Sequence, residues 1–210
     1  MASDAVELVI MEHFPAIDGV LGRYYDDMRR RMQTLVDVPV RSRNYCDPGD
    51  FGTAVAVVLS GSFAPWSLHD PAALARLGER LRRFDGAVLG ICGGMQQQAV
   101  FAGGEIGLRQ RQALGYGAVE VLDGRDLLAG LGPTAVVYEH HSWDVVSLPE
   151  DFVVLARSDD CAVEAIRARD RPWWGTQFHP EQSSVQNPAG AQVLSNFFAL
   201  AGVDAARTRA

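Results

Sequence analysis

The chain has 210 residues, of which 48% are apolar and 21% charged, with a formal net charge of −7 at pH 7. This length suits one domain around a single core, and the composition is that of a globular protein rather than a disordered or fibrous one. The acidic balance argues against nucleic acid as a partner, because a phosphate-binding surface needs clustered positive charge. We therefore expect a single domain over residues 1–210.

Membrane and export signals are not expected in this chain. The longest apolar runs, such as Ala54–Leu59, are too short to cross a bilayer, and the first residues carry acids where a signal peptide needs a basic segment. The three cysteines, Cys46, Cys92 and Cys161, cannot all pair and show no metal-ligand spacing. Free thiols fit a reducing compartment, so we expect a soluble cytoplasmic protein without a metal or cofactor.

The first half of the chain alternates short apolar runs with amphipathic stretches. Asp70 and Pro71 form a helix start, with Asp70 as the N-cap and Pro71 at the first helical position. The expected elements are strands at 6–11, 38–41, Ala54–Leu59 and 86–91, and helices from 17 to about 36, from 71 to about 84, and at Gly93–Phe101.

The second half of the chain favours strands. They are expected at 118–122, 135–138, 143–146, 153–156, 162–168 and 173–178, and a closing helix at 189–201. Strand–helix alternation followed by a strand-rich half predicts an α/β fold whose sheet is parallel at its core and mixed at one side.

The strongest local signal for chemistry surrounds Cys92. Residues 89–96, Leu-Gly-Ile-Cys-Gly-Gly-Met-Gln, lie between a buried strand and a helix, as in a nucleophile elbow. Gly90 and Gly94 stand where any side chain would clash with the neighbouring strand and helix. The helix N-terminus favours a thiolate at Cys92, and the Gly93 N–H can face an oxyanion. The alternative is a glycine-rich turn with a buried structural cysteine.

A second segment supplies a base for that nucleophile. Residues 175–181 read Gly-Thr-Gln-Phe-His-Pro-Glu. A cysteine nucleophile needs a base to take its proton and a third group to orient that base. Residues two apart on an extended chain project to one side, and Pro180 keeps the segment nonhelical, so Glu181 can reach His179. Alone, this tripeptide would more often be an ordinary loop.

Two further segments are less specific. Gly61, at the end of the buried strand Ala54–Leu59, can offer a second backbone N–H to an oxyanion, although it can equally be a simple loop glycine. His140 and His141 suggest a metal, but no third ligand stands at a matching spacing, so no metal site is expected.

Together and in this order, these segments resemble the class I glutamine amidotransferases, the triad-type glutaminase family. Residues 90–96 resemble its nucleophile motif and residues 175–181 its closing motif, and the similarity spans about residues 6–201. The resemblance implies a flavodoxin-like three-layer sandwich with a central, mostly parallel sheet, and hydrolysis of the side-chain amide of L-glutamine.

The resemblance also implies a role for each matching residue. Cys92 would form a γ-glutamyl thioester, His179 would protonate the departing ammonia and then activate water, and Glu181 would orient His179. The remaining implied contacts are an oxyanion hole made by Gly61 and Gly93, and binding of the amino-acid end of the substrate by Gln96, Ser142 and Trp143.

The sequence departs from the family in two places. The oxyanion loop, usually Gly-Gly-Pro or Pro-Gly-Pro, is Ser-Gly-Ser at residues 60–62. Residues 140–144 match the His-Ser motif of anthranilate and aminobenzoate synthase subunits only loosely and differ from the Ser-His motif of GMP synthases. The subfamily, the ammonia acceptor and the oligomeric state are therefore unassigned.

Residues 1–210 hold no synthase domain and no phosphate-binding glycine-rich loop to use the ammonia. The expected function is therefore a glutaminase subunit that passes ammonia to an acceptor on a separate synthase chain. The alternative is a stand-alone γ-glutamyl hydrolase that uses the same triad on other γ-glutamyl amides or peptides.

Overall fold

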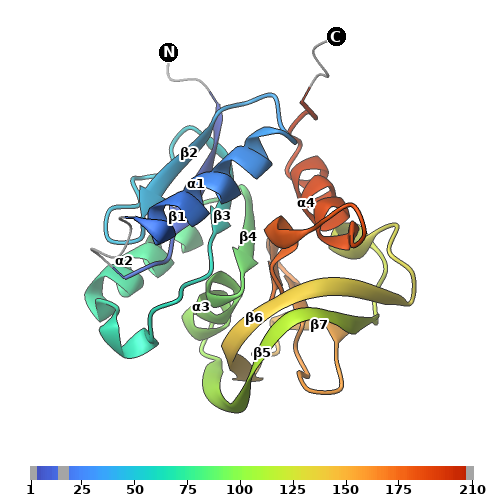
Figure 1. Cartoon of the computed structure of the whole chain (residues 1–210). Helices are drawn as coiled ribbons and strands as arrows, with labels where there is room; N and C mark the ends of the chain where they lie inside the picture. The colour runs from blue at the N-terminus through green and yellow to red at the C-terminus, as the bar shows by residue number, and fades with distance from the viewer. Residues whose placement is uncertain (1–3, 14–18, 207–210) are drawn as a thin grey trace.

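The computed structural model describes residues 4–13 and 19–206, in which a single sheet carries helices on both faces (Figure 1). The strands are β1 (Ala5–Ile10), β2 (Val40–Asn44), β3 (Ala54–Leu59), β4 (Ala87–Ile91), β5 (Glu105–Val121), β6 (Thr134–Ser147), β7 (Phe152–Arg157), β8 (Ala165–Ala168) and β9 (Trp173–Thr176). The α-helices are α1 (Val20–Gln33), α2 (Pro71–Arg82), α3 (Gly93–Phe101) and α4 (Ala189–Leu200).

The sheet has a parallel half and an antiparallel half, as the sequence predicts. Its strand order is β2-β1-β3-β4-β9-β8-β7-β5-β6. The strands from β2 to β9 along this order pair in parallel, and every pair beyond β9 is antiparallel. The carboxyl ends of β3, β4 and β9 therefore meet at one edge, where ligands bind in open α/β sheets.

Two hydrophobic clusters fix the three layers. On one face of the sheet, apolar side chains of α1 and α4 pack with Leu8, Val58 and Leu89. On the other face, apolar side chains of α2 and α3 pack with Val9 and Val57. Successive residues of a buried strand thus serve opposite layers, which is why β1, β3 and β4 are almost uninterrupted apolar runs.

The long hairpin of β5 and β6 differs most from the sequence expectation. The sequence predicts strands only at 118–122, 135–138 and 143–146, whereas β5 covers 17 residues and β6 14 residues without a break. Much of β5 is exposed, and its register with β6 shifts between Leu108 and Ala113. The polar run at residues 109–112 and three glycines of β5 conceal the alternation that marks a strand.

The remaining boundaries shift by a few residues. β2 begins at Val40 rather than 38, β8 begins at Ala165 rather than 162, and β9 ends at Thr176 rather than 178. The predicted start of the first helix at Ile17 lies outside the described residues. The start of α2 is confirmed, because the Ala72 N–H donates to Asp70 Oδ1 at 2.8 Å.

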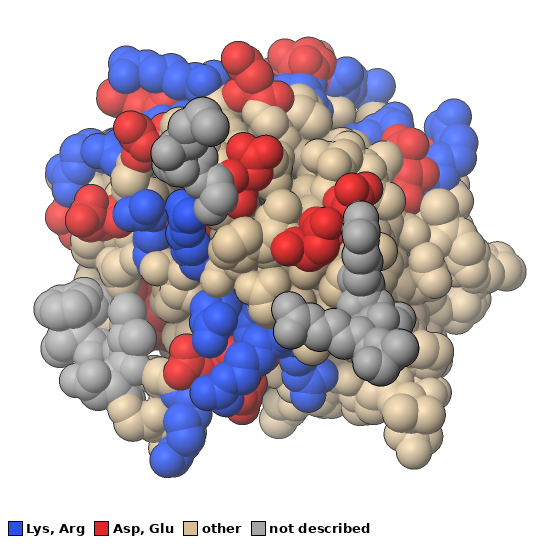
Figure 2. Space-filling view, turned by 90° about the horizontal axis from the view of Figure 1, so that it is seen from above, with Lys and Arg blue, Asp and Glu red and all other residues tan. Residues whose placement is uncertain are grey.

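Charged side chains of both signs share the face that holds the chain ends. Figure 2 shows basic and acidic groups interspersed there. On α1, Arg30 lies 2.9 Å from Asp27, so this part of the predicted solvated basic run is charge-paired at the surface. Among the described residues, no helix has the length and apolar character that a membrane span requires.

Candidate active site

Cys92 occupies the sharp turn between β4 and α3. Its φ of 51° and ψ of −108° lie outside the regions that L-residues usually adopt, which is the strained backbone expected of a nucleophile elbow. A Cβ at Gly90 would lie 2.5 Å from the Met95 nitrogen, and one at Gly94 would lie 2.5 Å from the Leu59 oxygen. Both glycines are therefore required by close backbone approach, as the sequence predicts.

His179 and Glu181 form a buried pair beside Cys92. His179 Nδ1 and Glu181 Oε1 are 2.6 Å apart, and the two side chains are 5% and 1% exposed. The geometry corrects one expectation, because Pro180–Gln182 form a 3₁₀ turn rather than an extended segment. Proline is readily accommodated at the first position of a helical turn, so the turn, and not strand alternation, brings Glu181 to His179.

Electrostatics at this pair favour an imidazolium facing a carboxylate. Burial lowers the pKa of His179, but the charges of Glu181 and of a Cys92 thiolate raise it well above its ordinary value. Burial raises the pKa of Glu181, but His179 and a hydrogen bond from Tyr24 bring it below its ordinary value. The arrangement can therefore hold a proton on His179 for a leaving group.

Two residues of α1 hold this pair in place, and sequence reasoning did not assign them to the site. The Tyr24 hydroxyl donates to Glu181 Oε1 at 2.7 Å and lies 3.3 Å from His179 Nδ1. Arg31 donates to the carbonyl oxygens of Glu181 and Ser183. Both are separated from the triad by most of the sequence, and no local motif marks such contacts.

The loop after β3 brings Gly61 to Cys92 and His179. A Cβ at Gly61 would lie 3.1 Å from His179 Cε1 and 3.3 Å from Cys92 Cβ, so only glycine leaves this space open. The loop is held by the buried Glu12 carboxylate, which accepts hydrogen bonds from the Phe63 N–H at 2.8 Å and the Tyr25 hydroxyl at 3.0 Å. Glu12 is a second positioning group that sequence reasoning missed.

A pocket of about 380 Å³ opens beside Cys92. Its lining includes four predicted site residues besides Cys92: Gly93, Gln96, Ser142 and Trp143. Gly93 is the first residue of α3, and the first N–H groups of a helix have no partner within it. The structure thus brings every predicted site residue to one place, at the carboxyl ends of β3, β4 and β9.

Gln96 is fixed by three hydrogen bonds. Its Nε2 donates to the Trp143 carbonyl at 2.6 Å and to Gln177 Oε1 at 3.2 Å, and its Oε1 accepts from Trp66 Nε1 at 3.0 Å. Gln177 in turn places its own Nε2 3.6 Å from Cys92 Sγ. Both N–H groups of Gln96 are therefore occupied, and only Oε1 retains capacity to accept another bond.

Sequence comparisons agree with this site. The model of the family described as "Glutamine amidotransferase class-I" matches residues 40–201. The chain is 37% identical over 136 residues to the glutamine-hydrolyzing subunit of GMP synthase from Pyrococcus furiosus, covering 65% of this chain and 71% of the relative. The corresponding GMP synthase subunit from Methanosarcina barkeri is 41% identical over 120 residues, covering 57% of this chain and 62% of the relative, which is under two thirds.

Solved structures share the fold. A candidate GMP synthase subunit from Thermoplasma acidophilum superposes with a TM-score of 0.76 at 24% identity, covering 94% of both chains. A glutamine amidotransferase from Thermotoga maritima gives a TM-score of 0.72 at 15% identity, covering 93% of this chain and 98% of the other. The flavodoxin-like α/β architecture implied by the sequence is therefore confirmed, and this chain belongs to the class-I glutamine amidotransferase family.

Proposed function

We propose that the chain is a glutaminase subunit, which hydrolyses the side-chain amide of L-glutamine and passes the ammonia to an acceptor on a separate synthase chain. The observation that carries this proposal is the strained Cys92 between the buried His179–Glu181 pair and a pocket lined by Gln96. The proposed active unit is the whole chain, residues 1–210, as one domain. Its three free thiols suit a reducing, cytoplasmic setting.

The proposed reaction has two steps. The Cys92 thiolate attacks the carboxamide carbon, His179 gives a proton to the departing ammonia, and a γ-glutamyl thioester forms. Water then attacks the thioester, His179 takes its proton, and glutamate leaves as the thiolate is restored. The N–H groups of Gly61 and Gly93 are proposed to stabilise the oxyanion of each tetrahedral intermediate, and Glu181 to keep His179 oriented.

Substrate recognition follows from the free hydrogen-bonding capacity in the pocket. Because both N–H groups of Gln96 are occupied, we expect its Oε1 to accept from the α-ammonium group of the substrate. The backbone of Ser142 and Trp143, which line the same pocket, is proposed to contact the same end. Gln96 would thus act as an acceptor, which favours an amino acid over an uncharged amide.

The names of the relatives support a separate acceptor chain. Both curated relatives described above are named as one subunit of a glutamine-hydrolyzing GMP synthase. We propose that the partner of this chain is a synthase of that type, although residues 140–144 differ from the GMP synthase motif. Glutamine turnover is then expected to be slow for the isolated chain and to rise when the synthase chain from the same source is added.

The first test is covalent labelling with diazo-oxo-norleucine, a glutamine-like electrophile, followed by intact-mass measurement and peptide mapping. Cys46 is the exposed cysteine, whereas Cys92 is buried. A non-selective electrophile would therefore label Cys46 first. A single adduct on Cys92 that excess glutamine prevents is the expected result, and an adduct confined to Cys46 would contradict the proposal.

The stand-alone γ-glutamyl hydrolase is tested by a comparison of substrates. A glutaminase whose partner binds beside the site should prefer glutamine to γ-glutamyl anilide, because the bulky aniline must occupy a pocket of about 380 Å³ together with the glutamyl group. A higher kcat/KM for the anilide than for glutamine, unaffected by the synthase chain, would favour the hydrolase.

A further inference from the structure

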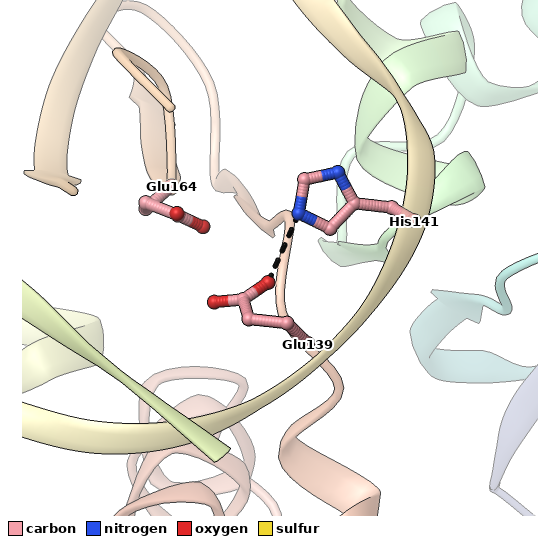
Figure 3. Close-up of side chains that lie close together, drawn as sticks. All are labelled: Glu139, His141 and Glu164. Atoms are coloured by element: carbon pink, nitrogen blue, oxygen red, sulfur yellow. Dashed lines mark ion pairs between the residues drawn. The ribbon is translucent and has the colours of Figure 1, made fainter. Parts of the chain in front are cut away.

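Three buried acid and imidazole side chains converge on the side of β6 away from Cys92. Glu139 and His141 alternate with His140 along β6, so they point to the opposite face of this strand. Glu164 reaches them from the segment between β7 and β8, and Figure 3 shows the three side chains pointing toward one another. One ligand atom from each lies within 4.8 Å of the others.

These side chains leave polar atoms without hydrogen bonds. Among the described residues, both carboxylate oxygens of Glu139, Nε2 of His141 and Oε2 of Glu164 are buried and have no hydrogen-bond partner. Glu139 Oε2 and His141 Nε2 are 3.1 Å apart, yet they do not form a hydrogen bond. Buried polar atoms are nearly always satisfied, so this cluster is suited to a group that binds all of these atoms at once.

The other ends of the same side chains are held by neighbouring groups. His141 Nδ1 has the Trp143 carbonyl oxygen at 3.3 Å and Asp144 Oδ1 at 3.0 Å, and Arg109 fixes Asp144 at 2.7 Å. A proton on Nδ1 is thus satisfied, and the lone pair of Nε2 faces the two glutamates. An imidazole held in this way by a carbonyl or a carboxylate is the usual arrangement around a metal-binding histidine.

Glu164 is oriented in the same manner. The Ser158 hydroxyl donates to its Oε1 at 2.7 Å, which leaves Oε2 for the cluster. The charges also favour a cation, because Arg109 is paired with Asp144, and within the described part of the chain His141 is the basic group beside Glu139 and Glu164. Burial lowers the pKa of His141, but the carboxylates of Asp144 and Glu139 raise it to about 10, which shows how strongly this place favours positive charge.

We propose that Glu139, His141 and Glu164 bind one divalent first-row transition cation such as Zn²⁺. Ligand atoms bound to one ion at about 2.1 Å lie at most about 4.2 Å apart, so the spacing here requires the side chains to close by about half an ångström. One imidazole and two carboxylates suit Zn²⁺ or Mn²⁺ better than Mg²⁺, which prefers oxygen and water ligands. His141 and Glu139 also line an open cavity, through which an ion and its water ligands can enter.

The site would stiffen the strand that serves the catalytic groups. On its other face, β6 presents the Tyr138 carbonyl to the His179 N–H at 2.8 Å, and the His140 carbonyl lies 3.8 Å from Cys92 Sγ. A cation that ties Glu139 and His141 to Glu164 would link this stretch of β6 to the segment before β8. The proposed role is therefore structural support of the active-site strand, independent of the chemistry at Cys92.

The test is metal binding by EDTA-treated protein in a Cys92→Ala background, which removes the thiolate–imidazole pair as a competing site. Zn²⁺ binding is followed by calorimetry, and Co²⁺ is used as a spectroscopic probe of the ligands. We expect one ion per chain and a Co²⁺ spectrum without a sulfur charge-transfer band. Glu164→Gln is expected to weaken Kd at least about 100-fold, and Asp144→Asn about 10- to 100-fold, as for an outer partner of a metal ligand.

The matched control is Glu120→Gln, which removes an exposed carboxylate of the neighbouring strand β5 that pairs with Arg157 at 2.7 Å. It is expected to keep the stoichiometry and Kd of the parent. His141→Gln provides a second ligand variant should Glu164→Gln fold poorly, as judged by its thermal unfolding without metal. The proposal is overturned if the parent takes up no stoichiometric ion, if sulfur ligation appears in the Co²⁺ spectrum, or if the ligand variants bind as tightly as Glu120→Gln.

Discussion

Replacing Tyr24 with phenylalanine tests whether this residue of α1 supports the triad. The substitution removes one hydroxyl and leaves the ring, which packs against Tyr25 and Phe63. The lost bond is the 2.7 Å contact to Glu181 Oε1. Oε2 of Glu181 has no partner among the described residues, so His179 would remain as the only side-chain donor to this buried carboxylate.

The expected cost follows from that contact. A hydrogen bond to a charged group contributes about 1.5–3 kcal/mol, so the free energy of unfolding should fall by that amount. The 2.6 Å contact between His179 and Glu181 survives, so catalysis should suffer less. A loss of about 1 kcal/mol in the transition state corresponds to roughly a fivefold lower kcat. Because the Tyr24 hydroxyl lowers the pKa of Glu181, the acid limb of kcat/KM should also move to higher pH.

The assay combines urea unfolding with a pH profile of glutamine hydrolysis, measured with the activating synthase chain where the isolated chain is too slow. Tyr25→Phe is the matched control, because its hydroxyl bonds Glu12 and the Gly61 carbonyl instead of Glu181. It should lose comparable stability without moving the acid limb. Unchanged stability and an unchanged acid limb in Tyr24→Phe would refute the supporting role assigned to Tyr24.

Four further outcomes are expected. Cys92→Ala should unfold at nearly the same urea concentration as the parent and show no glutamine turnover; an unfolded variant would make Cys92 structural. Glu181→Gln should reduce kcat less than His179→Ala, and the reverse order in steady-state kinetics would contradict the assignment of base and orienter. Gly94→Ala should cost about 1–3 kcal/mol or more in urea unfolding, because its Cβ would meet the Leu59 backbone at 2.5 Å, and unchanged stability would refute this. In Cys92→Ala protein, the raised pKa of His179 stabilises the fold below its ordinary 6.5 and is lost as pH rises, while the lowered pKa of Glu181 stabilises it above its ordinary 4.5 and is lost as pH falls, so the stability advantage over the same protein with Glu181→Gln should peak between these values.

The nucleophile elbow was predictable because its requirements are local. Gly90 and Gly94 are needed by atoms within the turn or on the adjacent strand, and the apolar runs on either side fix the strand and the helix. The same holds for the start of α2, where Asp70 and Pro71 act over two residues. Features that depend on a few consecutive residues leave a readable pattern in the sequence.

The supporting groups were not predictable, since they arise from packing between distant elements. Tyr24 and Glu12 are adjacent to apolar core residues, and nothing in their own neighbourhood marks them as partners of Glu181 or of the loop at Gly61. For the same reason, a search for ligands at regular spacing around His141 found none. Its partner Glu164 belongs to another segment and meets β6 only after the sheet has folded.

The departure of residues 140–144 from the family motifs has a physical explanation in the role of β6. The catalytic side of the molecule uses this strand through its backbone, and the choice of side chains is therefore constrained less than the path of the chain. The contacts are Tyr138 O with His179 N at 2.8 Å, His140 O with Cys92 Sγ at 3.8 Å, and Trp143 O with Gln96 Nε2 at 2.6 Å. A strand that acts through carbonyl groups must be held in register from its other face. In this chain the buried polar cluster on that face meets this need, which explains why the altered sequence at residues 140–144 preserves the geometry of the site.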